Sequence, residues 1–154
     1  MESIKEIYKI GYGPSSSHTM GPRKAAEIFK SKNLEAYKYN VTLYGSLAAT
    51  GKGHLTDKAI LDVLGEITTI NWEPKTFLAT HPNAVKFQAF DQNDNELNSW
   101  TAYSIGGGRI IDDSTNLREN HIYEHHKMEE IFNWTNHYGK TFWQYVEAHE
   151  ESDL

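Results

Sequence analysis

The spacing of apolar residues in the first part of the chain predicts two amphipathic helices with a strand between them. Apolar side chains recur at helical spacing over residues 20–32 and again over 57–67. Pro22 fits the first turn of the first helix, where the N–H that proline lacks would have no partner, and we expect Thr56 to cap the second. Residues 40–46 alternate apolar and polar positions, which indicates a strand.

The pattern then changes to strict alternation, which predicts a β-hairpin. Residues 84–91 and 95–105 alternate apolar and polar side chains, and the turn-forming residues 92–94 join them. Ile110 and Ile111 indicate a short return strand. The other expected elements are a helical turn within 2–9, a loop at 11–19 and two tail helices at about 124–137 and 140–151.

This order of elements predicts an α+β fold, an open sandwich of a mixed, mainly antiparallel sheet with the two early helices on one face. The composition of the chain changes after Asp113. We therefore expect one α/β domain over residues 1–113 and a helical tail over 114–154.

Composition excludes several classes of function. With 154 residues, 38% of them hydrophobic, the chain has the length and apolar content of one compact domain. No apolar stretch approaches the ~20 residues of a membrane-spanning helix, no secretory signal is visible, and a net charge of -6 argues against nucleic acid as a partner. We expect a cytoplasmic protein.

Because it has no cysteine, the chain alone can form no disulfide and no thiolate-bound iron–sulfur cluster.

The most informative segment is the hydroxyl-rich stretch before the first helix. It consists of Gly13 and Pro14 followed by Ser15, Ser16, Ser17, His18 and Thr19. Hydroxyls and unpaired backbone N–H groups at a helix start favour an anion such as a carboxylate or phosphate. The same residues are also typical helix caps, and the residues alone leave both interpretations open.

Two further segments contain candidate ligand-binding residues. Residues 45–54 combine glycines with Lys52 and end in His54, but the glycine spacing does not fit a nucleotide-binding loop, so we exclude that function. A histidine between a glycine loop and a helix is suited to proton transfer. Ser104 precedes three glycines at the end of a predicted strand, and Asn83 precedes the hairpin and offers both a donor and an acceptor.

The histidines of the tail raise the question of a metal site. His121 and His125 are four residues apart, as ligands on one helix face can be. Without an accompanying carboxylate motif, a solvated helix face is the better interpretation, and we assign no metal ligand in this chain.

Four segments, taken in order, resemble one family. They are GPSSSHTMGPRKA (13–25), LYGSLAATGKGHLTDKAI (43–60), NAVKFQAFD (83–91) and YSIGGGR (103–109). Together they are similar to the β chain, or N-terminal β domain, of iron–sulfur-dependent L-serine dehydratase, a carbon–nitrogen lyase that converts L-serine to pyruvate and ammonia. The tail resembles the helical connector that follows this domain in single-chain members.

The resemblance implies an active site shared between two portions, of which the α chain or domain binds a [4Fe-4S] cluster through its own cysteines. It implies His54 as the general base and Ser104 as a second catalytic residue. It also implies a substrate-binding set, consisting of Ser15, Ser16, Ser17, His18, Thr19 and Asn83. The aromatic tail indicates burial against the core or a second subunit, and a homodimer is expected.

The resemblance also carries an alternative function. The β domain is similar to the allosteric substrate-binding domain of some phosphoglycerate dehydrogenases, which implies a regulatory domain that binds L-serine or a small anion without catalysis. The sequence departs from the family pattern at Leu55, where glycine is usual, at Arg109, and in a short segment between Ile67 and His81.

Overall fold

The computed structural model describes residues 3–6, 10–114 and 122–150, which form two compact units. The larger unit contains residues 10–114, and the smaller combines residues 3–6 with 122–150. In the smaller unit the N–H of Ile4 donates to the carboxylate of Glu150 at 2.8 Å. The N-terminal turn therefore packs with the tail, although the sequence predicted it within the domain over 1–113. The functional division into a β-type domain and a connector stays a prediction.

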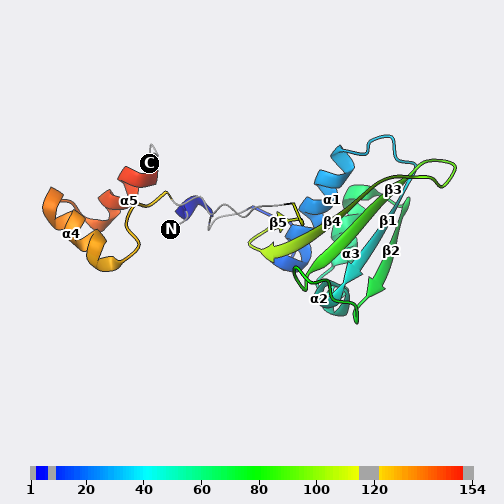
Figure 1. The fold of residues 1–154 in the computed structure, drawn as a ribbon, viewed down its shortest axis with the longest axis horizontal. Helices are drawn as coiled ribbons and strands as arrows, with labels where there is room; N and C mark the ends of the chain where they lie inside the picture. Colours follow the sequence, from blue (N-terminus) through cyan, green and yellow to red (C-terminus); the bar gives the residue numbers. More distant parts are fainter. Residues whose placement is uncertain (1–2, 7–9, 115–121, 151–154) are drawn as a thin grey trace. The chain divides into compact units, whose positions relative to one another are not determined.

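The larger unit is built on a five-stranded sheet of order β2-β1-β3-β4-β5 (Figure 1). Its strands are β1 (Lys38–Tyr44), β2 (Thr68–Glu73), β3 (Ala84–Phe90), β4 (Glu96–Gly106) and β5 (Arg109–Ile111). β1 and β2 are parallel, and the other neighbouring pairs are antiparallel. The predicted α+β fold with a mixed, mainly antiparallel open sheet is confirmed.

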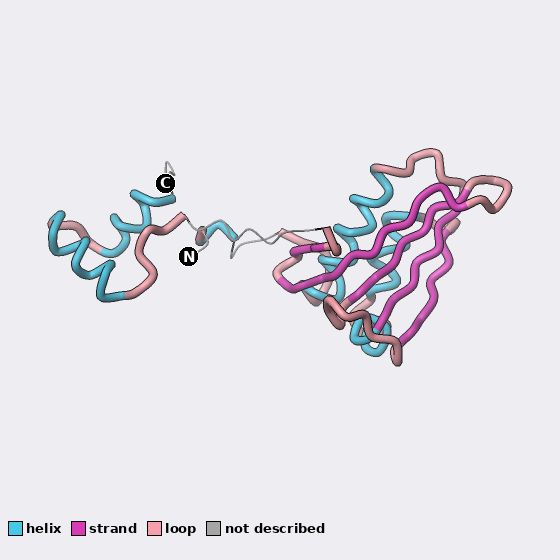
Figure 2. The backbone as a smooth tube through the Cα atoms, in the orientation of Figure 1, coloured by secondary structure: helices cyan, strands magenta, loops and turns pink. Residues whose placement is uncertain are grey.

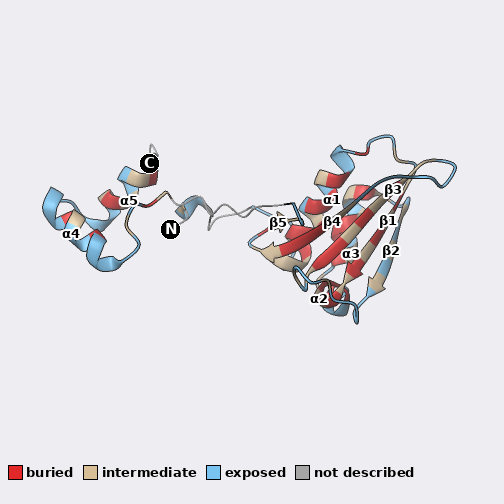
Figure 3. Ribbon diagram, viewed as in Figure 1, coloured by how far each residue is buried: buried red, intermediate tan, exposed pale blue. Residues whose placement is uncertain are grey.

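Three helices accompany this sheet: α1 (Gly21–Ser31), α2 (Gly45–Thr50) and α3 (Thr56–Leu64). α1 and α3 lie side by side on one face of the sheet, as predicted (Figure 2). The covered face is apolar because alternate residues of β1 point into it, and Figure 3 shows these buried positions along the strands. Phe29 of α1 stacks on Phe87 of β3 at a centroid distance of 5.4 Å, which joins the helical layer to the sheet.

The hairpin of β3 and β4 forms as expected. Its turn is stabilised by Asp91, whose carboxylate accepts the backbone N–H groups of Asn93 and Asn95 at 2.8 and 2.9 Å. Asp94 takes the left-handed conformation that this turn requires (φ 65°).

Several predictions for residues 40–73 are wrong. α3 ends at Leu64 rather than at residue 67, because Gly65 takes a positive φ of 86° that ends the helix. The chain then forms β2, a strand that the sequence analysis did not predict. The first strand ends at Tyr44 instead of Ser46, and residues 45–50, expected as a loop, form α2. Finally, Thr56 does not cap α3; it is the first helical residue, and Leu55 occupies the cap position.

The smaller unit consists of a 3-10 turn (Ile4–Glu6) and two helices, α4 (Met128–Tyr138) and α5 (Phe142–Glu150). Its core is formed by Tyr123, Ile131 and Tyr145. Within residues 3–6, 10–114 and 122–150, no helix has the length and apolarity to cross a bilayer.

Candidate functional site

The hydroxyl-rich segment folds into one turn of π-helix, Ser16–Met20, ahead of α1. The hydroxyl of Ser15 accepts the backbone N–H of His18 at 3.2 Å, so Ser15 acts as the cap of this turn. Ser17 lies beside the ring of His18, and Ser16 is exposed. Among the described residues nothing bonds to the Ser16 hydroxyl, which leaves it available to a ligand.

His18 is held on both sides of its ring. Its Nδ1 lies 2.9 Å from the hydroxyl of Ser17, and its Nε2 lies 3.2 Å from the hydroxyl of Ser46, at the start of α2. Burial lowers the pKa of His18 below its usual value, and the neighbouring ring of His54 lowers it further. His18 is therefore neutral at pH 7, and both of its nitrogens are engaged.

His54 is the second imidazole of this site. Its ring centroid lies 4.9 Å from that of His18, with 46° between the two planes, and its side chain is half-buried. Within the described part of the chain, no hydrogen-bond partner contacts the ring nitrogens of His54. An imidazole with this environment can exchange a proton with a bound molecule.

Two buried threonines join the segments that carry these histidines. The hydroxyl of Thr19 donates to the carbonyl of His54 at 2.8 Å, and the hydroxyl of Thr56 donates to the carbonyl of His18 at 2.5 Å. Both threonines are fully buried. The two bonds run in opposite directions between the same two segments, so they fix the positions of both histidines.

Leu55, next to His54, takes the left-handed conformation (φ 57°, ψ 35°). In this region the Cβ of an L-residue approaches the following carbonyl, which costs about 1–2 kcal/mol. Its side chain is 47% exposed, so packing of this side chain offsets little of the strain. The backbone that presents His54 is thus the one that glycine would adopt without strain.

Leu55→Gly is expected to stabilise the protein by about 0.5–1 kcal/mol, since relief of the strain exceeds the added entropy of the unfolded chain. The urea midpoint of unfolding measures this difference. Leu55→Ala is the control, because it keeps the Cβ and therefore the strain. Equal midpoints for the two variants would contradict this account.

Asn83 and Ser104 meet at the paired ends of β3 and β4. The N–H of Ser104 donates to the carbonyl of Asn83 at 2.9 Å, and the side-chain amide of Asn83 donates to the carbonyl of Ser104 at 3.2 Å. The segment before Asn83 is tied to α2, because the N–H of Ser46 donates to the carbonyl of Pro82 at 3.0 Å. Ser46 therefore links the histidine pair to the Asn83–Ser104 pair.

Ser104 carries a fully buried hydroxyl to which no described residue offers a hydrogen bond. It faces the start of α1 so closely that a Cβ added to Gly21 would lie 2.0 Å from its oxygen. A buried hydroxyl without a partner destabilises a fold, so its presence at this position calls for an explanation.

Ser104→Ala is expected to raise the stability of the protein by about 1 kcal/mol, because the desolvation cost of the unpaired hydroxyl disappears. Thermal or urea unfolding checks this, with Ser99→Ala on the exposed part of the same strand as control. If Ser104→Ala is less stable than the control, the hydroxyl has a partner in the folded protein.

The three glycines after Ser104 have a structural explanation. Gly106, Gly107 and Gly108 all take positive φ (96°, 58° and 69°) in the tight connection between β4 and β5. Conformations of this kind favour glycine. Arg109 is exposed at the start of β5.

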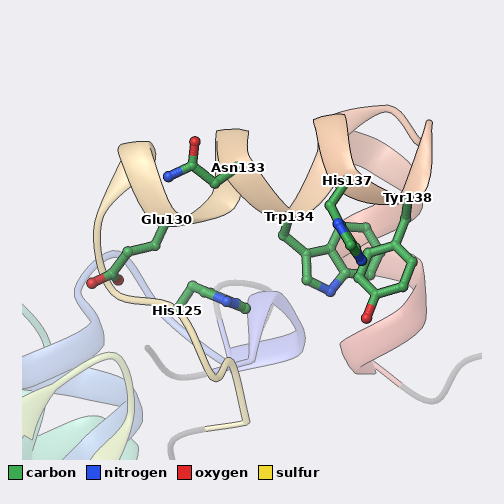
Figure 4. A pocket seen from close by; sticks show the side chains of 6 residues that line it. All are labelled: His125, Glu130, Asn133, Trp134, His137 and Tyr138. Carbon is green, nitrogen blue, oxygen red and sulfur yellow. The ribbon is translucent and has the colours of Figure 1, made fainter.

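The structure brings together His18, His54, Ser17 and Thr19, and joins them through Ser46 to Asn83 and Ser104. The sequence analysis did not identify Ser46; the signal that could have pointed to it is its place at the end of a predicted strand, directly after a glycine. Figure 4 shows a pocket in the smaller unit, on α4; it is lined by His125, Glu130, Asn133, Trp134, His137 and Tyr138. None of the predicted site residues lines it.

Comparison with known proteins identifies the family. The chain matches the family described as serine dehydratase beta chain over residues 3–67 and 62–115. The chain belongs to this family. The two matched pieces overlap at residues 62–67.

The names of curated relatives agree with this family assignment. L-serine dehydratase of Haemophilus influenzae is 33% identical over 74% of this chain and 34% of its own length. L-serine dehydratase of Helicobacter pylori (strain J99) is 36% identical over 70% of this chain and 32% of its own, and L-serine dehydratase 2 of Escherichia coli is 34% identical over 73% and 34%. This member of the family thus spans about a third of the length of the relatives that it matches.

Proposed function

We propose that this chain is the β portion of an L-serine dehydratase and supplies the general base and substrate-binding groups of its active site. The observation that carries the proposal is the pair of imidazoles, 4.9 Å apart, in which His18 is hydrogen-bonded on both nitrogens and His54 on neither. The family and its relatives named L-serine dehydratase supply the reaction class.

The chemistry of serine dehydration defines what the chain must contribute. The Cα proton of L-serine has to be removed and its β-hydroxyl has to leave, which gives aminoacrylate; this tautomerises and hydrolyses to pyruvate and ammonia. A half-buried imidazole with unoccupied nitrogens can accept the Cα proton. We assign this role to His54.

The substrate also needs groups that hold its carboxylate. The Ser16 hydroxyl at the exposed end of the turn before α1 and the side-chain amide of Asn83 are candidates for this role. His18 and Thr19 act differently: their hydrogen bonds position the segments around the site. Ser104 would find in the assembled site the partner that its hydroxyl lacks in the described chain.

The residues of this chain do not fit an iron–sulfur cluster, because the sequence has no cysteine to supply thiolate ligands. In the proposed assembly a [4Fe-4S] cluster belongs to the α portion, where it supplies a Lewis acid for the departing hydroxyl. In this proposal the chain therefore contributes substrate binding, substrate orientation and proton transfer to the reaction.

Co-expression with a cysteine-bearing α portion, followed by anaerobic cluster reconstitution and a pyruvate assay, tests the proposal. We expect pyruvate from L-serine only when both portions are present. A mixture with an intact cluster that makes no pyruvate would refute it. Binding of L-serine by the chain without any dependence of turnover on its residues would instead indicate a regulatory domain.

A further inference from the structure

The smaller unit contains a cluster of metal-ligating side chains that the proposed function does not use. Glu124, His125 and His149 each offer one ligand atom, and these atoms all lie within 4.8 Å of one another. Glu124 and His125 precede α4, and His149 lies in the last turn of α5. We propose that this trio binds a divalent transition-metal ion, with zinc as the first candidate.

Hydrogen bonds orient His149 for this role. Its Nδ1 lies 2.8 Å from the backbone carbonyl of Tyr145. Because a carbonyl only accepts, Nδ1 carries the proton and Nε2 keeps its lone pair for an ion. Metal-ligating histidines in proteins are usually held in this way by a bond to the other ring nitrogen.

The buried side chain of Tyr145 holds the other histidine as well. Its hydroxyl accepts the backbone N–H of His125 at 3.3 Å and lies 3.2 Å from Nδ1 of the same residue, which leaves Nε2 unoccupied. The ring of Tyr145 also packs on both imidazoles, with centroid distances of 5.7 Å to His125 and 4.2 Å to His149. One aromatic residue therefore positions both nitrogen ligands before any ion binds.

The third ligand, the carboxylate of Glu124, can change its position to suit an ion. Glu124 is exposed, and no described residue bonds to its carboxylate. Donors on a tetrahedral zinc ion lie roughly 3.4 Å apart, given zinc–ligand distances near 2.1 Å. Closing the trio from its present spacing of up to 4.8 Å thus needs movements on the order of an ångström, which rotation of the exposed glutamate and small tilts of the two imidazoles supply.

The donor set determines the class of ion. Two imidazoles and one carboxylate suit zinc and its first-row neighbours, and they suit calcium or magnesium poorly because those ions prefer oxygen ligands. Three protein ligands leave at least one position open to water or a further ligand. His125 also lines the pocket of Figure 4, so one of the ligands adjoins a surface pocket.

Calorimetric titration of the full chain with zinc chloride, together with cobalt(II) absorption spectra, tests the site. We expect one ion per chain, and a loss of affinity of at least about 100-fold in His149→Gln and in Glu124→Gln, since loss of a residue that only orients a ligand already costs about 10–100-fold. The control is His137→Gln, a histidine of the same unit outside the trio, which should bind as the wild type does.

Absence of binding, or equal binding by wild type and both trio variants, would overturn the proposal, and so would an equal loss in the control. If circular dichroism shows that His149→Gln is unfolded, the exposed Glu124→Gln variant decides the question alone. This experiment needs neither serine nor an α portion, so its outcome is separate from that of the proposed dehydratase function.

Discussion

Replacing His54 with alanine is expected to lower kcat for pyruvate formation by about 10²–10⁴-fold in the assembled enzyme, the usual contribution of a general base. The reason lies in the contrast between the two neighbouring imidazoles: His18 is held by hydroxyls on both nitrogens, and His54 by none. A steady-state pyruvate assay at saturating L-serine, with the cluster content matched between preparations, measures the effect.

The folding of the variant can be checked separately. The ring of His54 is only half-buried and the carbonyl that Thr19 contacts is backbone, so the alanine variant should keep its circular dichroism spectrum and unfolding midpoint. His137→Gln, in the other unit, should be fully active. A folded His54→Ala enzyme that turns over L-serine like the wild type would exclude this residue as the base.

The pH profile distinguishes a base from a structural residue. A general base acts only in its unprotonated form, so the residue that accepts the Cα proton gives the plot of kcat/KM against pH an ascending limb. The residual activity of His54→Ala should lack this rising limb. A residue that only shapes the site would lower the rate without changing the profile.

Elements with a strong periodic pattern were predictable from the sequence. The helix predicted over 20–32 is found at Gly21–Ser31, and the predicted hairpin strands lie within one residue of Ala84–Phe90 and Glu96–Gly106. Each of these elements buries one face, so its apolar residues recur along the sequence with the period of the helix or strand. The same reasoning gave the fold class, because the order of elements limits how the layers can stack.

The elements that were not predicted have weak local signals. β2 is an edge strand of six residues, TTINWE, whose positions alternate between half-buried and exposed. Only Ile70 and Trp72 of its inward positions are apolar, and two residues are too few to mark a strand in the sequence. α2, with the sequence GSLAAT, has one large apolar residue, Leu47, and is only six residues long, too short for a helical period to be visible. Both are fixed by tertiary contacts.

The residues of the site could be predicted individually from the sequence, but their arrangement in space could not. His18 and His54 could be proposed separately, but they are 36 positions apart, and their contact depends on how the turn before α1 meets the loop before α3. The role of Ser46 depends on the same meeting, since its hydroxyl matters only because the ring of His18 reaches it. A single sequence does not encode such long-range contacts in a form that periodicity reveals.

The hydroxyls that hold this arrangement should make a large contribution to stability. Replacing Thr19 and Thr56 together with valine keeps their shape and removes both hydrogen bonds, so that the carbonyls of His54 and His18 each lose a partner. Each loss in a fully buried position is expected to cost about 1–3 kcal/mol. Urea unfolding of the single and double variants measures the cost, with Thr69→Val on the exposed edge strand as control.

The two bonds connect the same two segments, so their effects should not add. Once Thr19→Val has weakened the contact between the two segments, the hydrogen bond of Thr56 stabilises it less. The free energy of unfolding of the double variant should therefore fall by less than the sum of the two single losses. The same loosening separates the two imidazoles, so the double variant should also lose activity in the assembled enzyme, while Thr69→Val should not. Strictly additive losses with full activity would show that the threonines act independently of the site and of each other.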